Sequence, residues 1–281
     1  MINGSLLINK EIGLTSRQEV NNISHAFNEK KVGHIGTLDP FADGLLIINL
    51  GSSTKIAPFL EVMDKGYIAT LKLGEKTDTG DLTGNVIETK EIPVLKKENI
   101  QDLLGKMVGE HEQIPPMYSA VKINGKQLYK YAREGKTLER KARLINIYDI
   151  KLLSFSSNLV VFYAKVSKGT HIRTLGEEIA EKLGTLGHLT KLTRVEVGPY
   201  KLEDSVSSEN AKESNLISIE KMLAHIPTIL VENELEKMAL NGMHIRLACT
   251  HDVVLVKSKK EIIALYKREP NGVYSCLRGL R

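Results

Sequence analysis

The chain has 281 residues, 42% of them hydrophobic, which is enough to bury one large domain or a large domain and a small one. No apolar run approaches the roughly 18 residues that span a bilayer, and the N-terminal residues lack a secretory pattern, so a cytoplasmic protein without a membrane partner is expected. Two cysteines are too few for a disulfide framework, and a net charge of +5 suits nucleic-acid binding as well as many ordinary enzymes.

The first predicted elements lead into a glycine-rich loop. A short buried strand is expected at residues 6–8, and Ser16 and Glu19 have the spacing of a capping box that starts a helix. The loop at residues 32–44 follows, with the sequence VGHIGTLDPFADG. The apolar run at residues 45–50 then predicts a buried strand, which would hold the loop rigidly.

Asp39 is the candidate functional group of this loop. It directly precedes Pro40, so its backbone is pushed out of the helical region into an extended or turn conformation. Functional side chains are often placed on loops that a scaffold braces. The local pattern alone is more typical of a polar turn before a strand, in which Asp39 only caps the backbone.

Strands and helices alternate through the rest of the chain. Further strands are predicted at 66–73, 85–89, 143–155, 159–165 and 188–197, and helices at 54–61, 100–107 and 172–183. A helix at 232–241 and strands at 253–257, 262–267 and 273–277 indicate a separate β-rich module. We therefore expect one domain over residues 1–230 and a small one over residues 231–281.

The segment at residues 113–143 is rich in basic and aromatic residues. Its part from 121 to 143 has a net charge of +6, and three tyrosines lie in or beside it, Tyr118, Tyr129 and Tyr131. Cations that follow phosphates and rings that stack on unpaired bases suit RNA. A solvated surface hairpin and helix would have the same composition.

Motifs for cofactors and metals do not occur in the sequence. There is no phosphate-binding P-loop, no dinucleotide fingerprint, no His-Glu-x-x-His and no nucleophile elbow. Asp78 and Asp81 lack the spacing of a calcium loop. We therefore expect no required nucleotide, redox cofactor or metal.

Five stretches, in order along the chain, together resemble the TruB family, the tRNA pseudouridine-55 synthases. They resemble the catalytic loop, a second signature, the RNA-gripping insertion and two final motifs of that family, at residues 33–46, 67–84, 113–133, 167–175 and 188–194. The chain departs from the family pattern at Glu11, which is usually Pro, at His171, which is usually Tyr, and at Thr193, which is usually Arg.

The resemblance implies an α+β fold with a mixed, mostly antiparallel central sheet flanked by helices, the pseudouridine synthase fold. The segment 113–143 would be an RNA-gripping insertion, and residues 231–281 a short PUA-like RNA-binding module. The implied activity is that of a cofactor-free isomerase, which flips uridine 55 out of the T-loop of tRNA and rejoins its base through C5. The implied partner is the tRNA elbow, bound by a monomer without a guide RNA.

The resemblance also implies a role for each site residue. Asp39 would be the catalytic carboxylate, with Arg173 as the cation that favours its charged form. Tyr67 and Leu192 would lie on the two sides of the uracil, and His34 would stack where the flipped nucleotide had been. His171 would offer a hydrogen bond, and Lys10 would support the site near Tyr67.

Three alternatives stay open at this point. Asp39 either attacks C1′ of the ribose or removes the C2′ proton to give a glycal. An RNA chaperone that grips the tRNA elbow would need the same basic segment, as a second role or instead of the chemistry. Archaeal and eukaryotic relatives act with guide RNAs, although the short terminal module and the lack of charged tails favour the stand-alone form.

Overall fold

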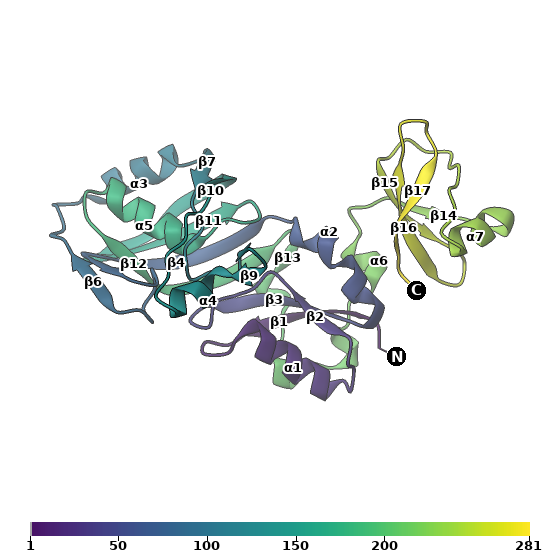
Figure 1. Ribbon diagram of the computed structural model, residues 1–281, viewed down its shortest axis with the longest axis horizontal. Coiled ribbons are helices and arrows are strands. Elements are labelled where there is room, and N and C mark those ends of the chain that lie inside the picture. Colours follow the sequence, from purple (N-terminus) through teal and green to yellow (C-terminus); the bar gives the residue numbers. More distant parts are fainter. Residues whose placement is uncertain (1) are drawn as a thin grey trace.

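A computed structural model describes residues 2–281, and its largest element is a nine-stranded sheet (Figure 1). Its strands are β1 (Gly4–Lys10), β2 (Val32–Ile35), β3 (Asp43–Leu50), β4 (Lys65–Leu73), β7 (Gly109–Gln113), β10 (Arg143–Ser156), β11 (Leu159–Val166), β12 (Gly187–Val197) and β13 (Tyr200–Lys201). Their order is β1-β3-β12-β4-β11-β10-β7, with β2 beside β3 and β13 beside β12. Only β12 and β3 pair in parallel, so the sheet is mixed and mostly antiparallel, as predicted.

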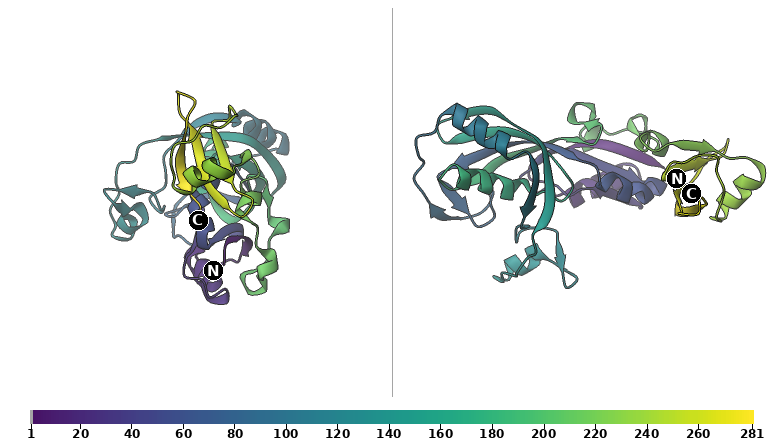
Figure 2. Two further views of the ribbon diagram at one scale, coloured as in Figure 1. Left: turned by 90° about the vertical axis from the view of Figure 1, so that its right-hand side faces the viewer. Right: turned by 90° about the horizontal axis from the view of Figure 1, so that it is seen from above.

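Besides strands, the chain contains short helices, and two small hairpins form sheets of their own. The helical elements are α1 (Ser16–Ala26), η1 (Gly51–Ile56), α2 (Ala57–Glu61), α3 (Lys97–Lys106), α4 (Leu128–Arg133), α5 (Ile172–Lys182), η2 (Leu202–Asp204), η3 (Ser208–Asn210), η4 (Glu213–Asn215), α6 (Ile219–Met222) and α7 (Asn233–Leu240). The hairpins join β5 (Glu75–Thr77) to β6 (Val86–Thr89) and β8 (Lys122–Ile123) to β9 (Lys126–Gln127). The segment with β8, β9 and α4, which we call the arm (residues 113–143), stands out from the sheet in Figure 2.

The last 54 residues build a second, four-stranded sheet at one end of the molecule (Figure 1). Its strands are β14 (Thr228–Leu230), β15 (Val253–Lys257), β16 (Ile262–Arg268) and β17 (Tyr274–Gly279). Val254 and Tyr266 belong to a core of its own, whereas Leu255 and Leu265 join a core shared with the first sheet. The assignment of a separate RNA-binding module to residues 231–281 stays a prediction.

The predicted strand after the glycine-rich loop is buried on both faces. Leu46 and Ile48 of β3 point into one hydrophobic core and Leu45 and Ile47 into another, all with 0% exposure. A strand that is covered on both sides needs a near-continuous apolar run instead of an alternating one. The start of β3 is therefore fixed, and with it the end of the loop that contains Asp39.

The predicted capping box was wrong by one residue. Thr15, not Ser16, is the N-cap of α1, and Gln18 closes the box. The Ser16 hydroxyl instead bonds the main chain of Leu38, and Glu19 is fully buried. The short strands β2, β5, β7, β8, β9, β13 and β14 were not predicted, because they are too short to show a periodic pattern.

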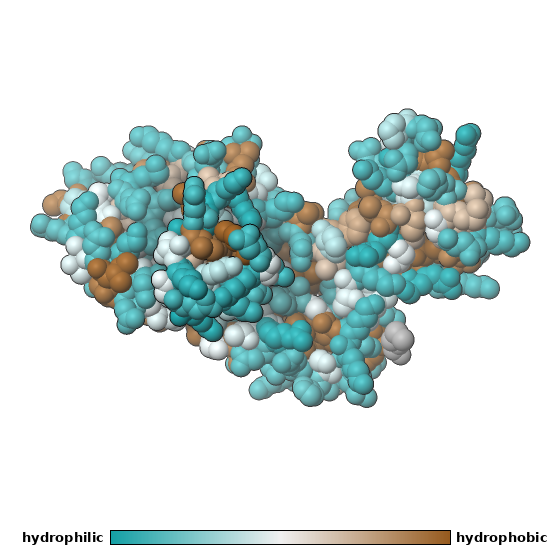
Figure 3. All heavy atoms as spheres, viewed as in Figure 1, coloured by the Kyte–Doolittle hydropathy of each residue, from teal (hydrophilic) through white to brown (hydrophobic). Residues whose placement is uncertain are grey.

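Within residues 2–281, no helix has the length and apolar character that a membrane crossing requires. Most of the face in Figure 3 is hydrophilic, and the apolar residues form scattered spots on it. Scattered apolar side chains of this kind are normal for a protein surface.

Gly44 is expected to tolerate no side chain. Its φ is +101°, and a Cβ there would lie 2.4 Å from the carbonyl oxygen of Arg194, where β12 pairs with β3. Gly44→Ala should lower the free energy of unfolding by about 2–4 kcal/mol in urea denaturation. The matched control is Gly33→Ala, where nothing lies within 4 Å of the added methyl. Equal stabilities of the two variants would contradict this account.

Candidate active site

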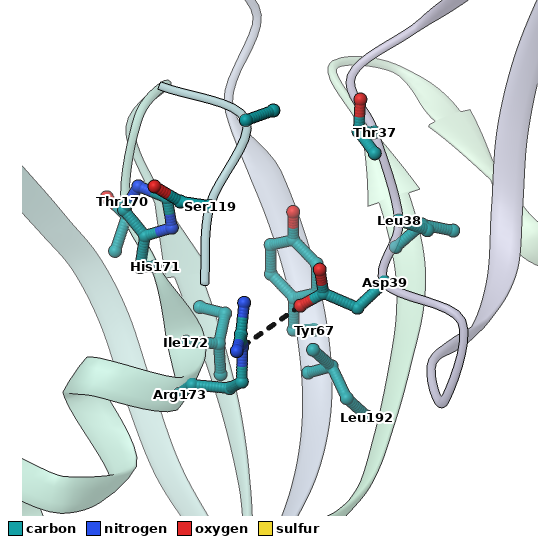
Figure 4. A pocket seen from close by; sticks show the side chains of 11 residues that line it. Thr37, Leu38, Asp39, Tyr67, Ser119, Thr170, His171, Ile172, Arg173 and Leu192 are labelled. Carbon is teal, nitrogen blue, oxygen red and sulfur yellow. Dashed lines mark ion pairs between the residues drawn. The ribbon is translucent and has the colours of Figure 1, made fainter. Parts of the chain in front are cut away.

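Asp39 lies on the loop between β2 and β3, beside a pocket that opens to solvent (Figure 4). The cavity volume is about 130 Å³, so the pocket is small and open to solvent. Five segments line it, with the residues Thr37, Leu38, Asp39, Tyr67, Ser119, Ala120, Thr170, His171, Ile172, Arg173 and Leu192. Five of the seven predicted site residues therefore line one pocket: Asp39, Tyr67, His171, Arg173 and Leu192.

Arg173 connects the segments around this pocket. It belongs to the first turn of α5, and its Nε lies 3.0 Å from Oδ2 of Asp39 (Figure 4). Its Nη1 lies 3.3 Å from Oδ2 of Asp81, and its side chain is only 6% exposed. The same guanidinium donates to the carbonyl oxygens of Thr79 at 2.7 Å and Tyr118 at 2.5 Å. One cation thus joins the Asp39 loop, the turn at residues 77–84 and the root of the arm.

The charge state of Asp39 is set by opposing effects. Burial raises the pKa of its carboxyl group, while the Arg173 guanidinium beside it and the Lys10 ammonium lower this pKa. The Asp81 carboxylate raises the pKa further, because like charges disfavour ionisation. The ionised form of Asp39 therefore depends on Arg173, its ion-pair partner.

Tyr67 and Leu192 form an apolar wall of the pocket. Tyr67 is on β4 and Leu192 is on the neighbouring strand β12, and each is less than 10% exposed. In Figure 4 the Tyr67 ring lies behind the Asp39 carboxyl group and Leu192 lies below it. This wall offers a flat, apolar surface next to a carboxylate and a guanidinium.

The two predicted histidines differ in position. His171 is the N-cap residue of α5 and lines the pocket, and the Gln113 amide bonds its main-chain N–H at 2.8 Å and its carbonyl at 3.3 Å. Burial, with the cations Arg173 and Arg143, lowers the pKa of the His171 imidazole to about 4. His34 is on β2, outside the pocket lining, with Nε2 3.2 Å from Oγ1 of Thr37. Burial, followed by Arg194 and Arg17, lowers the pKa of His34.

Lys10 lies behind the pocket and not in it. Its side chain is fully buried, and its ammonium donates to the carbonyl oxygens of Glu11 at 2.9 Å and Leu14 at 2.7 Å. Burial lowers the pKa of Lys10 to about 8, although nearby carboxylates, that of Glu19 first, oppose this shift. Lys10 therefore supports the chain segment before α1 through main-chain contacts.

Two charged residues of the site were not predicted from the sequence. Asp81, considered there only as a calcium ligand, shares Arg173 with Asp39 and accepts a hydrogen bond from the main chain of Thr83 at 2.9 Å. Arg194 is 1% exposed and donates to the carbonyls of Leu45 at 2.7 Å and Gly36 at 3.0 Å, so it holds both ends of the Asp39 loop. Both belong to stretches that carried the family resemblance, which was their only signal.

No cluster of metal-binding side chains was found in the part of the chain that the structure describes. Among residues 2–281, no group of three or more His, Cys, Asp or Glu side chains is placed to hold a metal ion. The polar groups of the pocket are instead a carboxylate, a guanidinium, an imidazole and hydroxyls. Such groups can transfer protons, attack carbon or bind a polar ligand directly.

Known proteins with similar sequences agree on one family. Residues 24–172 match the model of the TruB family pseudouridylate synthase N-terminal domain. The chain is 41% identical to a tRNA pseudouridine synthase B of Francisella philomiragia, across 94% of this chain and 90% of the relative. It is 37% identical to a tRNA pseudouridine synthase B of Mesoplasma florum, across 98% and 97%. The chain belongs to the TruB family. The resemblance seen in its sequence is thereby confirmed.

Solved structures also share the fold of this TruB family member. A Cbf5-Nop10-Gar1 complex matches with a TM-score of 0.75 and 22% identity, over 99% of this chain and 85% of that chain. An H/ACA RNP bound to a substrate RNA containing 2′-deoxyuridine matches with a TM-score of 0.73 and 20% identity, over the same shares. Likeness at this identity shows the fold alone, and it confirms the predicted pseudouridine synthase fold.

Asp81→Asn is expected to lower the turnover of the TruB reaction about 10- to 100-fold in a protein that still folds. The substitution removes one of the two carboxylates that fix the Arg173 guanidinium, and a small displacement of a catalytic group has effects of this size. Single-turnover kinetics on tRNA, with circular dichroism as the folding check, measure it. The matched control is Asp78→Asn in the same turn, whose carboxylate bonds Asn85 and not Arg173. A wild-type rate for Asp81→Asn would rule this role out.

His171 is expected to make folding sensitive to mild acid. Its folded-state pKa of about 4 lies below the ordinary 6.5, so the unfolded chain binds more protons between these pH values. Stability should therefore fall as the pH drops from 6.5 to 4, by up to about 3 kcal/mol from this group. His171→Tyr, the usual family residue, lacks this titration. Urea unfolding of both proteins from pH 7 to 4 should show that the free energy of unfolding falls more steeply with acid in wild type than in His171→Tyr. Parallel pH dependences of the two would refute the assignment.

Proposed function

We propose that this protein is a tRNA pseudouridine-55 synthase, which isomerises the uridine of the T-loop to pseudouridine. The observation that supports it most is the Asp39 carboxylate, ion-paired to Arg173 in a pocket with Tyr67 and Leu192. The relatives that cover nearly the whole chain are named tRNA pseudouridine synthase B. The reaction needs a carboxylate near the sugar and no cofactor.

Asp39 is the catalytic residue of this proposal. The C1′–N1 bond breaks, the uracil turns, and a C1′–C5 bond forms, while a proton leaves C5 and one binds N1, so atoms and electrons balance. Asp39 either attacks C1′ or takes the C2′ proton to give a glycal, and both routes require its ionised form. Arg173 opposes the effect of burial and so favours that form.

The other site residues receive and hold the nucleotide. A base inside a folded loop must be flipped out, which costs on the order of a few kcal/mol of unstacking. Tyr67 would lie against the uracil face and handle the C5 proton, with Leu192 on the other side. His34, beside Thr37 on the loop, would stack where the nucleotide had been and offset part of the cost. His171 would meet the substrate as a neutral imidazole, and Lys10 would act from behind the loop.

The arm supplies the basic surface for RNA. Its part from 121 to 143 has a net charge of +6, and the cations Lys126 and Arg133 lie 4.5 and 5.5 Å from the ring centres of Tyr131 and Tyr129. Such a surface follows the phosphate backbone and shape of RNA more than its base edges. We expect the arm to close over the T-stem-loop, with the PUA-like module at 231–281 as a second contact.

The remaining parts of the proposal concern the partner and the place. We propose that the protein acts on the tRNA elbow as a monomer, without a guide RNA, and in the cytoplasm. Relatives that match nearly the whole chain are named tRNA pseudouridine synthase B, which supports tRNA as the substrate. Mass mapping of pseudouridine in exposed tRNA would give the target position.

Asp39→Asn should abolish the reaction, with a rate at least about 10³-fold below wild type, because an amide can neither attack C1′ nor accept the C2′ proton. Unmodified tRNA with tritium at C5 of uridine reports the reaction through tritium release. The variant should bind tRNA and fold like wild type, since the change is isosteric. No release by wild type, or full release by Asp39→Asn, would overturn the proposal.

A tRNA-folding role is the second candidate, because the basic charge of the arm would attract RNA irrespective of the chemistry. The Asp39→Asn variant separates the two activities. If it still assists the refolding of tRNA, the protein has both roles, and loss of assistance together with turnover would leave the isomerase alone.

A further inference from the structure

Residues 10–16, from the end of β1 to the start of α1, lie outside the pocket but contact the loop that holds Asp39. They contain the motif Lys-x-x-Gly-x-Thr-Ser, in which the proposed chemistry gives a role to Lys10 alone. The main chain on each side of Asp39 is bonded to this segment. The N–H of Gly13 donates to the carbonyl of Pro40 at 2.7 Å, and Ser16 bonds Leu38.

Ser16 makes two hydrogen bonds to one residue. Its hydroxyl accepts from the N–H of Leu38 at 2.9 Å and lies 3.2 Å from the carbonyl oxygen of Leu38, to which it donates. Ser16 is 1% exposed and Leu38 is 3% exposed, so water cannot replace these bonds. Within residues 2–281 no other hydrogen bond reaches the main chain of Leu38. Without the hydroxyl, a buried donor and a buried acceptor directly before Asp39 would lose their partner.

The position of Ser16 in its helix leaves the hydroxyl available for this task. A serine next to the start of a helix usually bonds the helix itself, but here Thr15 is the cap and bonds the main chain of Gln18. The segment is held in turn by Lys10, whose ammonium donates to the carbonyl of Leu14 at 2.7 Å. The contacts thus run from a buried lysine through the start of α1 to Leu38.

We infer that Ser16 is a positioning residue for the reaction, which fixes the main chain at Leu38 and thereby the place of the Asp39 carboxylate. Arg173 holds the carboxylate from the other side of the pocket, and the side chain of Asp39 is still 37% exposed. The two bonds from the Ser16 hydroxyl fix the backbone directly before this group, and the bond from Gly13 to Pro40 fixes it directly after. The inference rests on the proposed function for its kinetic part only, because the protection of the Leu38 amide from hydrogen exchange can be measured without turnover.

The test compares wild type with Ser16→Ala, Ser16→Thr and the matched control Ser53→Ala. Ser53 is also fully buried, and its hydroxyl has no hydrogen-bond partner within residues 2–281. Ser16→Ala should turn over saturating tRNA about 10- to 100-fold more slowly, since misplacement of a reacting group has effects of this size. Its Kd for tRNA should stay at the wild-type value. Ser16→Thr keeps the hydroxyl and should restore most of the rate, and Ser53→Ala should match wild type.

Hydrogen exchange gives a readout that needs no activity. The Leu38 amide should be protected in wild type, Ser16→Thr and Ser53→Ala, and should exchange at least about 10-fold faster in Ser16→Ala, at a temperature where all four are folded. Wild-type turnover by Ser16→Ala, unchanged Leu38 protection, or a rate loss equal to its unfolded fraction would each overturn the inference. A wild-type protein that forms no pseudouridine would remove the proposed function, while the exchange result would still decide the role of Ser16.

Discussion

The site depends on one buried guanidinium between two carboxylates. Arg173 is almost inaccessible to solvent, and a buried cation is costly unless it is paired and hydrogen-bonded. Asp39, Asp81 and two carbonyl oxygens meet that need. The ion pair also acts on Asp39, since burial raises the pKa of its carboxyl group and the Arg173 guanidinium lowers it. Removal of either charge therefore changes the other, and the electrostatics of the pocket form one unit.

The scaffold places this unit through two buried strands. Strand β3 begins where the Asp39 loop ends, and it runs parallel to β12 with Asp43 opposite Thr193 and Gly44 opposite Arg194. Leu192 directly precedes these paired residues on β12, so the register that fixes the end of the loop also sets the position of the apolar wall beside it. The Arg194 side chain then reaches the carbonyls of Gly36 and Leu45. Loop and wall cannot shift independently, because one strand pairing positions both.

The sequence predicted those features that depend on local pattern. The alternating burial of β4 and the apolar stripe of α5 follow from periodicity, and both elements lie where it indicated. The link between Asp81 and Arg173 has no such signal, because the two residues are far apart in the chain and meet only through tertiary packing. Ser16 misled for a related reason: its spacing fits a cap, but a partner 22 residues away in sequence, Leu38, takes its hydroxyl. Short strands such as β7 form because a neighbour pairs with them.

The arm is attached to the site at two points. The carbonyl of Tyr118, near the root of the arm, accepts from the guanidinium that holds Asp39. The Gln113 amide, where the arm begins, bonds both main-chain groups of His171 at the start of α5. A shift of the arm root relative to α5 would break these bonds and free an N–H of Arg173. Arg173, the ion-pair partner of Asp39, therefore has its full set of acceptors only while the root of the arm is in this position, so the place of the arm and the surroundings of the carboxylate are coupled.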